Sequence, residues 1–494
     1  MKNFLRASFL TIILLASLCL SIHWFVREVS GIEPGTYSWP MFHYDIRRKG
    51  YAKFAGPLTN HTMWIQQLNE SIVLSSPAVV DGRVFIGGYK EFMGTRMPSS
   101  VWCLNETTGD ILWRYQTGSC ISSSPIVVDG RVFIGSYDYK LYCLDETTGA
   151  ELWNYTTGGE ILSSPVVDHM IGVPNPDRVF FGSMDGNVYC LNESNGAWIW
   201  QYPTGGSVES SPAIFEQRVF IGSDDNYLYC LKEETGTLKW RYLTSGPVRS
   251  TPSIGVWVLG ALKVVGVGSD DGHLYAIDTD AGTLKWVSPY LGGAVFSSPA
   301  VRTDMSCNFY VGSMNGSVYS IAIPGVIMWN KPIGGTISSS PALDGSAHLY
   351  IGHAWSKIPP GVDYGAVKCL NILRTGPSAG GAVKWTYNTG THVTSSPAVA
   401  DGMVFVGAKD GKVYCFGSPP GNVDAIAVWQ HTEEQEEPEF DIWYSVWDES
   451  ARRWWTPTGA VAAPVAMLPH GDDHDPNIAF NRLNESICVW SHFD

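Results

Sequence analysis

Residues 163–167 read Ser-Ser-Pro-Val-Val, residues 179–183 read Val-Phe-Phe-Gly-Ser, and residues 187–191 read Asn-Val-Tyr-Cys-Leu. A fourth apolar run ends at Trp200. Short runs of β-branched and aromatic residues between glycine-rich turns are typical of β-strands. Asp185-Gly186 lies between the second and third runs and predicts a type I′ hairpin, in which both central residues have positive φ. Four antiparallel strands within about 40 residues predict one blade of a β-propeller.

This unit recurs along most of the chain. The Ser-Ser-Pro triplet, with threonine as its second residue once, occurs eight times, and its proline stands at 77, 125, 165, 212, 252, 299, 341 and 397. A tryptophan precedes each proline by 12 or 13 residues: Trp64, Trp113, Trp153, Trp200, Trp240, Trp286, Trp329 and Trp385. A repeat of this length built from short strands is the signature of a propeller.

The first tryptophan indicates how the ring closes. Trp64 has no blade before it, and the last unit, from Pro397 to Phe416, has three strand-like runs and no terminal tryptophan. We therefore expect the run around Trp64 to supply the outermost strand of the last blade. Such pairing removes the two open edges of a linear array. The sequence predicts an all-β protein with an eight-bladed propeller over 59–417.

A family resemblance rests on the turn before each tryptophan. Residues 143–153, Cys-Leu-Asp-Glu-Thr-Thr-Gly-Ala-Glu-Leu-Trp, resemble the tryptophan-docking motif (Ala-x-Asp-x-x-Thr-Gly-x-x-x-Trp) of the pyrroloquinoline-quinone (PQQ) repeat family. Residues 39–42, Trp-Pro-Met-Phe, resemble the segment that often precedes these repeats. The resemblance implies a ring related in architecture to WD40 and YVTN-like propellers, with the eight tryptophans docking its blades. The family includes quinoprotein alcohol dehydrogenases, the outer-membrane assembly scaffold lipoprotein and surface propellers, so function stays open.

The enzymatic members set requirements that this sequence does not meet. The resemblance implies that they hold PQQ near the propeller axis over a tryptophan, beside a vicinal disulfide, with calcium and a catalytic aspartate. This chain has no Cys-Cys dipeptide and no Cys-x-x-Cys-His haem motif. No catalytic position of the family matches a residue here, so we expect no cofactor, neither PQQ nor calcium, and no catalysis.

Ten cysteines in an exported protein resemble a disulfide framework, but their places in the repeat argue against one. Six of them occupy one slot of the repeat, which is Ala276 or Ser320 in other blades: Cys103, Cys143, Cys190, Cys230, Cys369 and Cys415. Equivalent positions of adjacent blades should lie about 10 Å apart, whereas a disulfide needs Cα atoms within about 7 Å. We expect free thiols in the core.

Charge and the N-terminus indicate the compartment. The 494-residue chain has a net charge of −15, which argues against binding to nucleic acid. Lys2 and Arg6 precede an apolar run, so residues 1–26 are predicted to be a signal peptide or a transmembrane anchor. An extension over 27–58 would follow. We expect an exported, surface-attached or secreted protein that contacts the membrane through this N-terminal segment only.

The C-terminal part changes character after a linker at 418–423. Residues 425–431 read Ala-Ile-Ala-Val-Trp-Gln-His, and residues 486–492 read Ser-Ile-Cys-Val-Trp-Ser-His. Between them, residues 441–447 alternate as a strand does. This pattern resembles one blade of a sialidase-like propeller and the start of another. We expect an incomplete β-repeat module over 424–494.

Candidate binding residues lie where the repeats differ. The residue before Ser-Ser-Pro is charged in two successive blades, at Glu209 and Arg249, which is either an axial ligand funnel or a solvated ion pair. Two insertions, 89–96 and 354–364, should lie at the same end of the ring and flank the last blade. They carry the remaining candidates: Tyr89, Phe92, Arg96, Trp355, Lys357 and Tyr364. Long loops on a rigid scaffold often bind partners, although they also drift neutrally.

These features favour a monomeric, non-catalytic propeller that binds a protein or a glycan at the cell envelope. A scaffold for envelope protein assembly is the first alternative. An oxidoreductase that resembles the PQQ-dependent alcohol dehydrogenases is the second.

Overall fold

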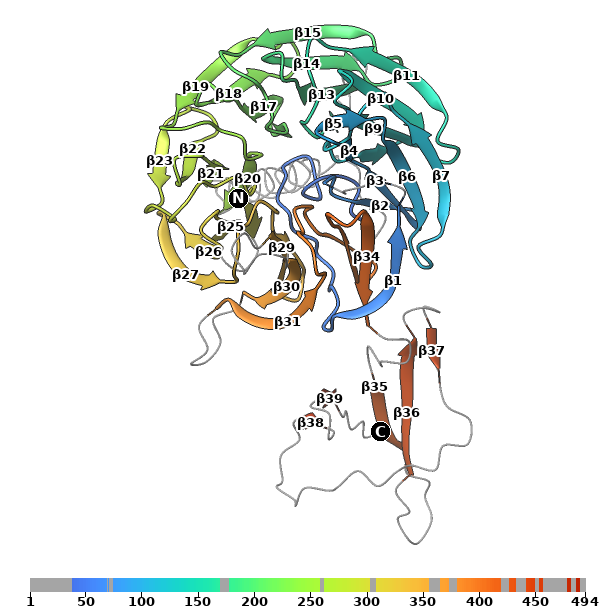
Figure 1. Ribbon diagram of the computed structural model, residues 1–494. Coiled ribbons are helices and arrows are strands. Elements are labelled where there is room, and N and C mark those ends of the chain that lie inside the picture. Colours follow the sequence, from blue (N-terminus) through green and yellow to red (C-terminus); the bar gives the residue numbers. More distant parts are fainter. Residues whose placement is uncertain are drawn as a thin grey trace, which may run out of the picture. The chain divides into compact units, whose positions relative to one another are not determined.

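The computed structural model describes five strands between 426 and 488 and, in the earlier part of the chain, residues 38–418 apart from 69, 71–73, 169–176, 258–261, 303–307, 355–364 and 373–379. Residues up to Ser418 form one compact unit, and residues from Pro419 form a second. In the first unit, eight four-stranded antiparallel sheets surround a central axis (Figure 1). The predicted eight-bladed propeller is confirmed.

Every blade runs from an innermost strand at the axis to an outermost strand at the rim. Blade 1 consists of β2 Ala78–Val80, β3 Arg83–Gly87, β6 Ser100–Asn105 and β7 Ile111–Gln116, and blade 2 of β8 Ile126–Val128, β9 Arg131–Gly135, β10 Lys140–Asp145 and β11 Glu151–Thr156. Blade 3 consists of β12 Val166–Asp168, β13 Arg178–Gly182, β14 Asn187–Asn192 and β15 Trp198–Pro203, and blade 4 of β16 Ala213–Ile214, β17 Arg218–Gly222, β18 Tyr227–Lys232 and β19 Leu238–Leu243. Blade 5 consists of β20 Ser253–Trp257, β21 Leu262–Gly268, β22 Leu274–Asp278 and β23 Leu284–Val287, and blade 6 of β24 Ala300–Arg302, β25 Asn308–Gly312, β26 Ser317–Ala322 and β27 Val326–Pro332. Blade 7 consists of β28 Ala342–Leu343, β29 His348–Ala354, β30 Gly365–Asn371 and β31 Ala382–Asn388, and blade 8 of β32 Ala398–Ala400, β33 Met403–Gly407, β34 Lys412–Gly417 and β1 His61–Gln67.

The ring closes through the shared blade that the sequence predicts. β1 pairs antiparallel with β34, and the register runs from His61 opposite Gly417 to Gln67 opposite Lys412. The N-terminal strand is therefore the rim of the last blade. Its pairing covers the edge of β34, which the C-terminal end of the ring would otherwise expose.

The hairpin between the second and third strands differs from our prediction. At Asp185-Gly186 only the glycine has a positive φ, 85°, and Gly186 N donates to Ser183 O at 3.1 Å. This geometry is a type I turn followed by a left-handed residue, not a type I′ turn. Two consecutive positive φ angles occur between first and second strands instead, as at Asp81-Gly82 (50° and 73°). An Asp-Gly pair is compatible with both turns, so the dipeptide alone does not distinguish them.

The structure gives a physical reason for the Ser-Ser-Pro repeat. The backbone N–H of the second hydroxyl residue donates to the side-chain oxygen of the equivalent residue in the next blade, at 2.8–3.3 Å. The eight bonds form a closed circle around the axis through Ser76, Ser124, Ser164, Ser211, Thr251, Ser298, Ser340 and Ser396. The bond from Ser396 to Ser76 joins blade 8 to blade 1. A buried donor without this acceptor would cost about 1–3 kcal/mol.

The repeat tryptophans join each blade to the next one. Trp200 Nε1 donates to Glu233 O in blade 4 at 2.9 Å, and its ring packs on Gly236, where an added Cβ would lie 2.6 Å away. The same bond to the next blade is made by Trp64, Trp113, Trp153 and Trp240. Trp385 donates to Pro57 O at 3.3 Å instead, because blade 8 receives its outermost strand from the N-terminus.

The cysteine slot is a core position. The six repeat cysteines and Cys120 are buried and free, which confirms the prediction of unpaired thiols for these positions. Burial raises the pKa of Cys103 and Cys143 to about 12. These thiols therefore remain protonated at neutral pH and are poor nucleophiles.

The second unit contains β35 Ile426–His431, β36 Asp441–Asp448 and β37 Arg453–Trp455 in one sheet, and β38 Ile478–Phe480 with β39 Ser486–Cys488 in another. β35 and β36 lie where the sequence predicts strands. The sialidase-like character of this unit stays a prediction. No helix within the described residues is long and apolar enough to cross a membrane, and residues 1–26 lie outside them.

One buried carboxyl group makes the stability of the ring depend on pH. Glu233 is fully buried, and burial, reinforced by the charge of Asp168, raises its pKa from 4.5 to about 8. The folded protein thus keeps a proton that the unfolded chain releases above pH 4.5. We expect the free energy of unfolding to fall as the pH rises through this interval. Thermal melts from pH 5 to 9 should show a smaller decrease for Glu233→Gln, whose amide stays neutral; equal slopes would contradict the assignment.

Candidate functional site

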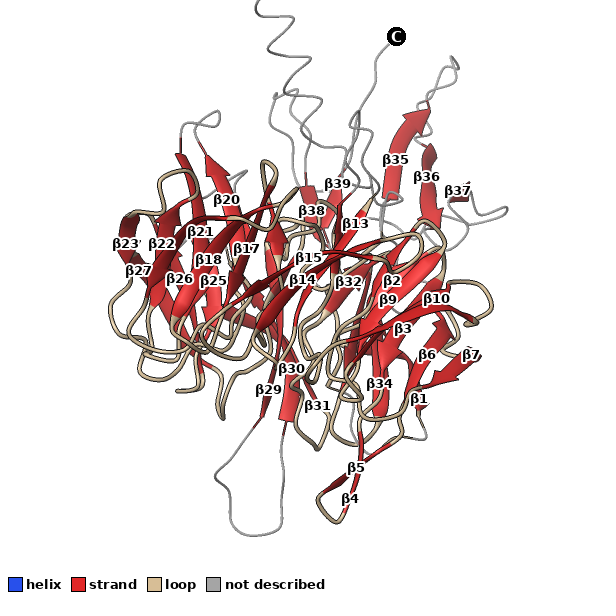
Figure 2. Ribbon diagram, turned by 90° about the horizontal axis from the view of Figure 1, so that it is seen from above, coloured by secondary structure: helices blue, strands red, loops and turns tan. Residues whose placement is uncertain are grey.

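The two ends of the ring differ. One end, which we name the insertion face, carries the Ser-Ser-Pro segments and the connections from second to third strands. The other end, the turn face, carries the tight turns such as Asp81-Gly82. The connection in blade 1 contains an extra hairpin, β4 Lys90–Phe92 and β5 Thr95–Met97, which projects beyond the insertion face (Figure 2).

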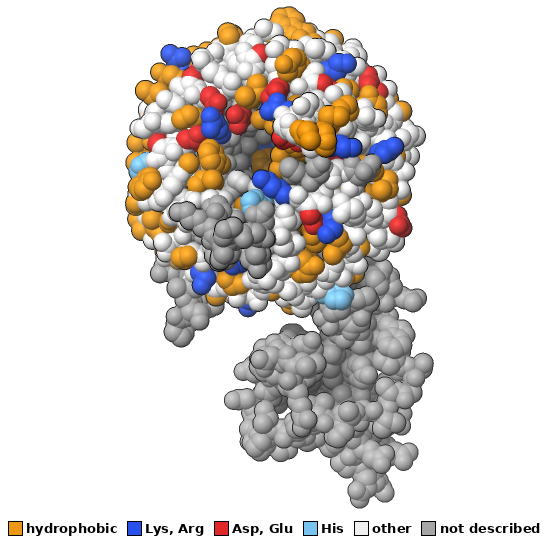
Figure 3. Space-filling view, in the orientation of Figure 1, with side chains coloured by type: hydrophobic (Ala, Val, Ile, Leu, Met, Phe, Trp, Pro, Cys, Tyr) orange, Lys and Arg blue, Asp and Glu red, His pale blue; other side chains and the backbone are white. Residues whose placement is uncertain are grey.

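A hollow marks the axis on the insertion face, and charged side chains gather at its edge (Figure 3). The residue before each Ser-Ser-Pro triplet keeps part of its surface exposed: Leu74, Ser122, Leu162, Glu209, Arg249, Phe296, Ser338 and Thr394. Each blade therefore contributes one variable side chain. The set is apolar in blades 1, 3 and 6, and charged in blades 4 and 5.

Arg249 is shared by three carboxylates. Its Nε and Nη2 donate to Asp224 Oδ1 and Oδ2 at 2.9 and 3.2 Å, and its Nη1 lies 3.1 Å from Asp270 Oδ2. Glu209 Oε1 is more distant, at 3.8 Å from Nε. The structure thus brings both predicted charged residues together, but Arg249 pairs more closely with two aspartates that we did not predict.

The electrostatics of this cluster follow from the excess of acids. Burial raises the pKa of Glu209, and the nearby Asp224 charge adds to the shift. Burial also raises the pKa of Asp270. The bond from Asp224 raises the pKa of Arg249. One guanidinium neutralises one of three carboxylates, so the cluster presents net negative charge to the hollow and suits cationic groups.

The stem of the β4–β5 hairpin is fixed by three of its neighbours. The Tyr89 and Tyr137 rings pack edge to face, with centroids 5.8 Å apart. The Arg96 guanidinium lies 4.2 Å from the centre of the Tyr137 ring and pairs with Glu160. Cys120 Sγ lies 3.0 Å from Lys90 O. Tyr89 and Arg96, which we predicted as binding anchors, therefore hold the hairpin against blade 2 and the segment leading to blade 3.

The tip of the hairpin is apolar and exposed. Phe92 is 65% exposed and Met93 is 89% exposed. Met93 has a φ of 49° and Gly94 a φ of 77°, so a methionine adopts the left-handed region that favours glycine. The fold thus accepts backbone strain of about 1–3 kcal/mol while it leaves two large apolar side chains in solvent.

The other predicted insertion belongs to blade 7. Its candidates Trp355, Lys357 and Tyr364 lie outside the described residues. The β29 strand before it and the β30 strand after it place both ends of the insertion on the insertion face. Its predicted place beside the blade 1 hairpin stays a prediction.

Sequence reasoning missed Tyr137, Glu160, Asp224 and Asp270. Three of them have a common signal. Each of the three is the residue x in a Gly-Ser-x-Asp sequence: Ser136-Tyr137-Asp138, Ser223-Asp224-Asp225 and Ser269-Asp270-Asp271, each after a glycine. Alignment of the repeats at this second variable position would have found them. Glu160 has no such signal.

The residues at the axis do not fit PQQ with calcium. Residues 38–54 fill the axis below the hollow, with Trp39 and His43 2% exposed and Arg48 0% exposed. Among the residues that the structure describes, no group of three or more histidine, cysteine, aspartate or glutamate side chains is arranged to hold a metal. The Asp224 and Asp270 carboxylates at the hollow are already paired with the Arg249 guanidinium.

We compared the chain with protein-family models, solved structures and curated proteins. A family model described as the outer membrane protein assembly factor BamB matches residues 48–211 and 184–354. The solved BamB of Moraxella catarrhalis is 19% identical, with 72% of this chain and 97% of that chain covered and a TM-score of 0.54. A comparison with curated proteins gives no match.

Two solved enzymes share the architecture as well. A europium-containing methanol dehydrogenase is 13% identical, with 79% of this chain and 100% of that chain covered and a TM-score of 0.64. The quinohemoprotein alcohol dehydrogenase of Comamonas testosteroni is 14% identical, with 80% and 82% covered and a TM-score of 0.61. At such identities the likeness shows the fold alone.

Proposed function

The chain belongs to the family of the outer membrane protein assembly factor BamB, and we propose that it is a non-catalytic scaffold that binds a protein partner through its insertion face. The tip of the β4–β5 hairpin carries this proposal. Exposed apolar side chains on a fixed stem are typical of an interface anchor, because little conformational freedom is lost on binding. The family relative is named an assembly factor, which favours a protein over a glycan.

The magnitude of the tip contact constrains the kind of partner. Burial of Phe92 and Met93 would contribute about 1.5–3 kcal/mol each, which alone corresponds to a dissociation constant of roughly millimolar or weaker once association entropy is subtracted. A partner must therefore also contact the hollow beside the tip. A protein that fits an apolar pocket over the tip and places a basic group near Arg249 and its carboxylates would satisfy both surfaces.

Charge disfavours a lipid surface as the main partner. The net charge of −15 repels anionic bilayers and their negative surface potential. The tip itself has only two apolar residues, Phe92 and Met93. The charge of Arg96 on β5 is paired with Glu160, so it adds little attraction to an anionic lipid surface. Export to the envelope, based on residues 1–26, belongs to the same proposal and is tested by mass spectrometry of the native N-terminus.

Replacement of Phe92 and Met93 by alanine should weaken partner binding by about 1–3 kcal/mol for each side chain. The melting temperature should stay within a degree or two, since both side chains are exposed. A photo-crosslinking residue at position 92 of the full chain identifies the partner in envelope extract, and titration calorimetry with the purified partner then measures the loss.

The matched control is Leu58→Ala. Leu58 is 69% exposed and precedes β1 at its turn-face end, so its loss should leave affinity unchanged. Equal binding by wild type and the hairpin double variant would contradict a role for the tip. Dye reduction with added PQQ, calcium and alcohol tests the enzymatic alternative, and we expect it to stay at background.

A further inference from the structure

The N-terminal segment of the ring crosses the axis and contacts nearly every blade. We name residues 38–54 the strap. In six blades, the backbone N–H two residues after the Ser-Ser-Pro proline donates to a strap carbonyl oxygen at 2.7–2.9 Å. The pairs are Val79 with Trp39, Val127 with Pro40, Ile214 with Ile46, Ile254 with Arg47, Val301 with Lys49 and Leu343 with Gly50. The edges that innermost strands turn toward the axis are thus paired.

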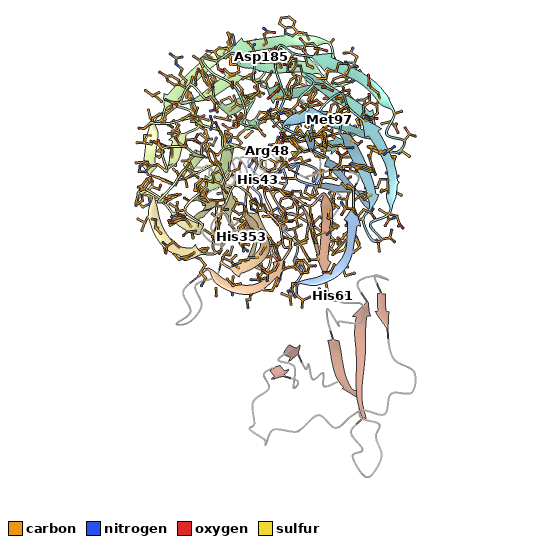
Figure 4. The ribbon with its side chains drawn as sticks, viewed as in Figure 1. His43, Arg48, His61, Met97, Asp185 and His353 are labelled. Atoms are coloured by element: carbon orange, nitrogen blue, oxygen red, sulfur yellow. The ribbon has the colours of Figure 1, made fainter. Side chains whose placement is uncertain are left out.

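Blade 3 is contacted by a side chain. Arg48 lies at the centre of the ring (Figure 4) and is 0% exposed. Its Nη2 donates to Ser164 O and Pro165 O at 3.1 and 2.9 Å, its Nε to Pro212 O at 3.0 Å, and its Nη1 to Phe42 O at 2.6 Å. The guanidinium occupies a cage of carbonyl oxygens from blades 3 and 4 and from the strap. Burial lowers the pKa of Arg48 to about 9.

The cage is selective for the shape of this side chain. Four carbonyl oxygens receive donors from three different nitrogens, which only the planar fork of arginine supplies. A lysine would keep the charge and lose this geometry. An apolar residue of equal length would leave buried carbonyl groups without donors, which is costly in a dry interior.

The strap holds an unusual conformation to reach these groups. His43, Tyr44 and Arg48 have φ angles of 57°, 74° and 56°, a region that non-glycine residues rarely adopt. Asp45 supports the bend, since its Oδ1 accepts from Arg47 N and Lys49 N at 3.1 and 3.2 Å. The side chain of Lys49 pairs with Asp45 at 3.0 Å and stays partly exposed. Strain of this kind persists only where the surroundings fix it.

We propose that the axis of the propeller is a recognition site for an arginine-bearing peptide segment, and that the strap is its ligand, bound within the same chain. The backbone N–H groups of six innermost strands bind the strap backbone, and the carbonyl cage binds the guanidinium. Only residues 55–60 separate the strap from β1. Such a short connection gives an effective concentration of roughly millimolar or above, so the strap excludes competing segments. The site is independent of the proposed partner on the insertion face.

A cut in the connection tests this proposal on the full chain. A protease site inserted between Leu58, which is exposed, and Thr59 separates the N-terminal fragment from β1 and removes no residue from either part. We expect the fragment to remain on the ring through gel filtration. Its immediate loss from a ring that keeps its near-ultraviolet circular dichroism would overturn the proposal.

Exchange with synthetic peptides then tests the chemistry. The cut protein is refolded from urea with an excess of dye-labelled peptide spanning residues 38–58, and incorporation is measured by fluorescence after gel filtration. The wild-type peptide should compete with the fragment according to its molar excess. Peptides with Arg48→Met should be at least 100-fold weaker and Arg48→Lys at least 10-fold weaker, whereas the neighbouring charge removal Lys49→Met should change affinity less than about threefold, as a surface pair predicts.

Because the substitutions are made in the peptide, the ring keeps its wild-type sequence, and a loss of incorporation cannot come from a variant ring that fails to fold. Equal incorporation of the Arg48→Met and wild-type peptides would overturn the recognition of arginine. A ring that refolds alone and then takes up no wild-type peptide would overturn the role of the strap as a ligand. If the cut chain does not refold, retention of the fragment in the gel-filtration measurement decides the proposal.

Discussion

Deletion of residues 1–67 should convert a soluble propeller into an aggregating protein without a cooperative unfolding transition. The deletion removes the strap, all of β1 and Trp64, whose indole donates to Glu106 O in blade 1 at 2.8 Å. Loss of one buried tryptophan costs about 3–5 kcal/mol, against a total stability of about 5–15 kcal/mol for a typical domain. The exposed edge of β34 would then be free to pair with other molecules.

A deletion that ends at residue 36 is the control, because it keeps the strap and β1. Gel filtration and thermal melts should show a monomer with the wild-type melting temperature for this variant. A soluble 68–494 chain with one sharp transition would contradict the closure by β1. An intermediate deletion that ends at residue 58 separates the two contributions, because it removes the strap and keeps Trp64.

The ring was predictable because its evidence is repeated. Eight tryptophans and eight Ser-Ser-Pro triplets define the repeat even where single units are irregular. Trp64 has no repeat unit before it, and the last unit, which ends at Phe416, has no tryptophan after it, so these two segments are expected to complete one blade. The wrong turn type at Asp185-Gly186 did not matter for this result. A hairpin at that place is enough to fix the order of strands, whichever turn it uses.

The strap was not predictable from the same sequence. It occurs once, so no repeat exposes its pattern, and its contacts use backbone carbonyl groups that any residue supplies. Arg48 also contradicts the general expectation that arginine lies at the surface. The stem of the β4–β5 hairpin poses a similar problem, because the ring contact of Arg96 with Tyr137 joins different blades and has no signature in local sequence.

Two tryptophans of one strand should respond very differently to truncation. Trp200 is 6% exposed, whereas Trp198, on the same β15 strand, is 55% exposed. We expect Trp200→Ala to lower the free energy of unfolding by about 3–5 kcal/mol and Trp198→Ala to change it by about 0.5 kcal/mol or less. Guanidinium chloride unfolding, followed by circular dichroism, measures both.

The partner of Trp200 provides the reciprocal test of blade docking. Gly236 has a φ of 68°, and an added Cβ would lie 2.6 Å from the indole ring. Gly236→Ala therefore both strains the backbone and displaces Trp200 from the Glu233 carbonyl group. If docking is the role of this tryptophan, the double variant Trp200→Ala, Gly236→Ala should lose less stability than the sum of the single variants, because the clash disappears with the ring. Strict additivity would show that the indole stabilises its own blade and does not hold blade 3 to blade 4.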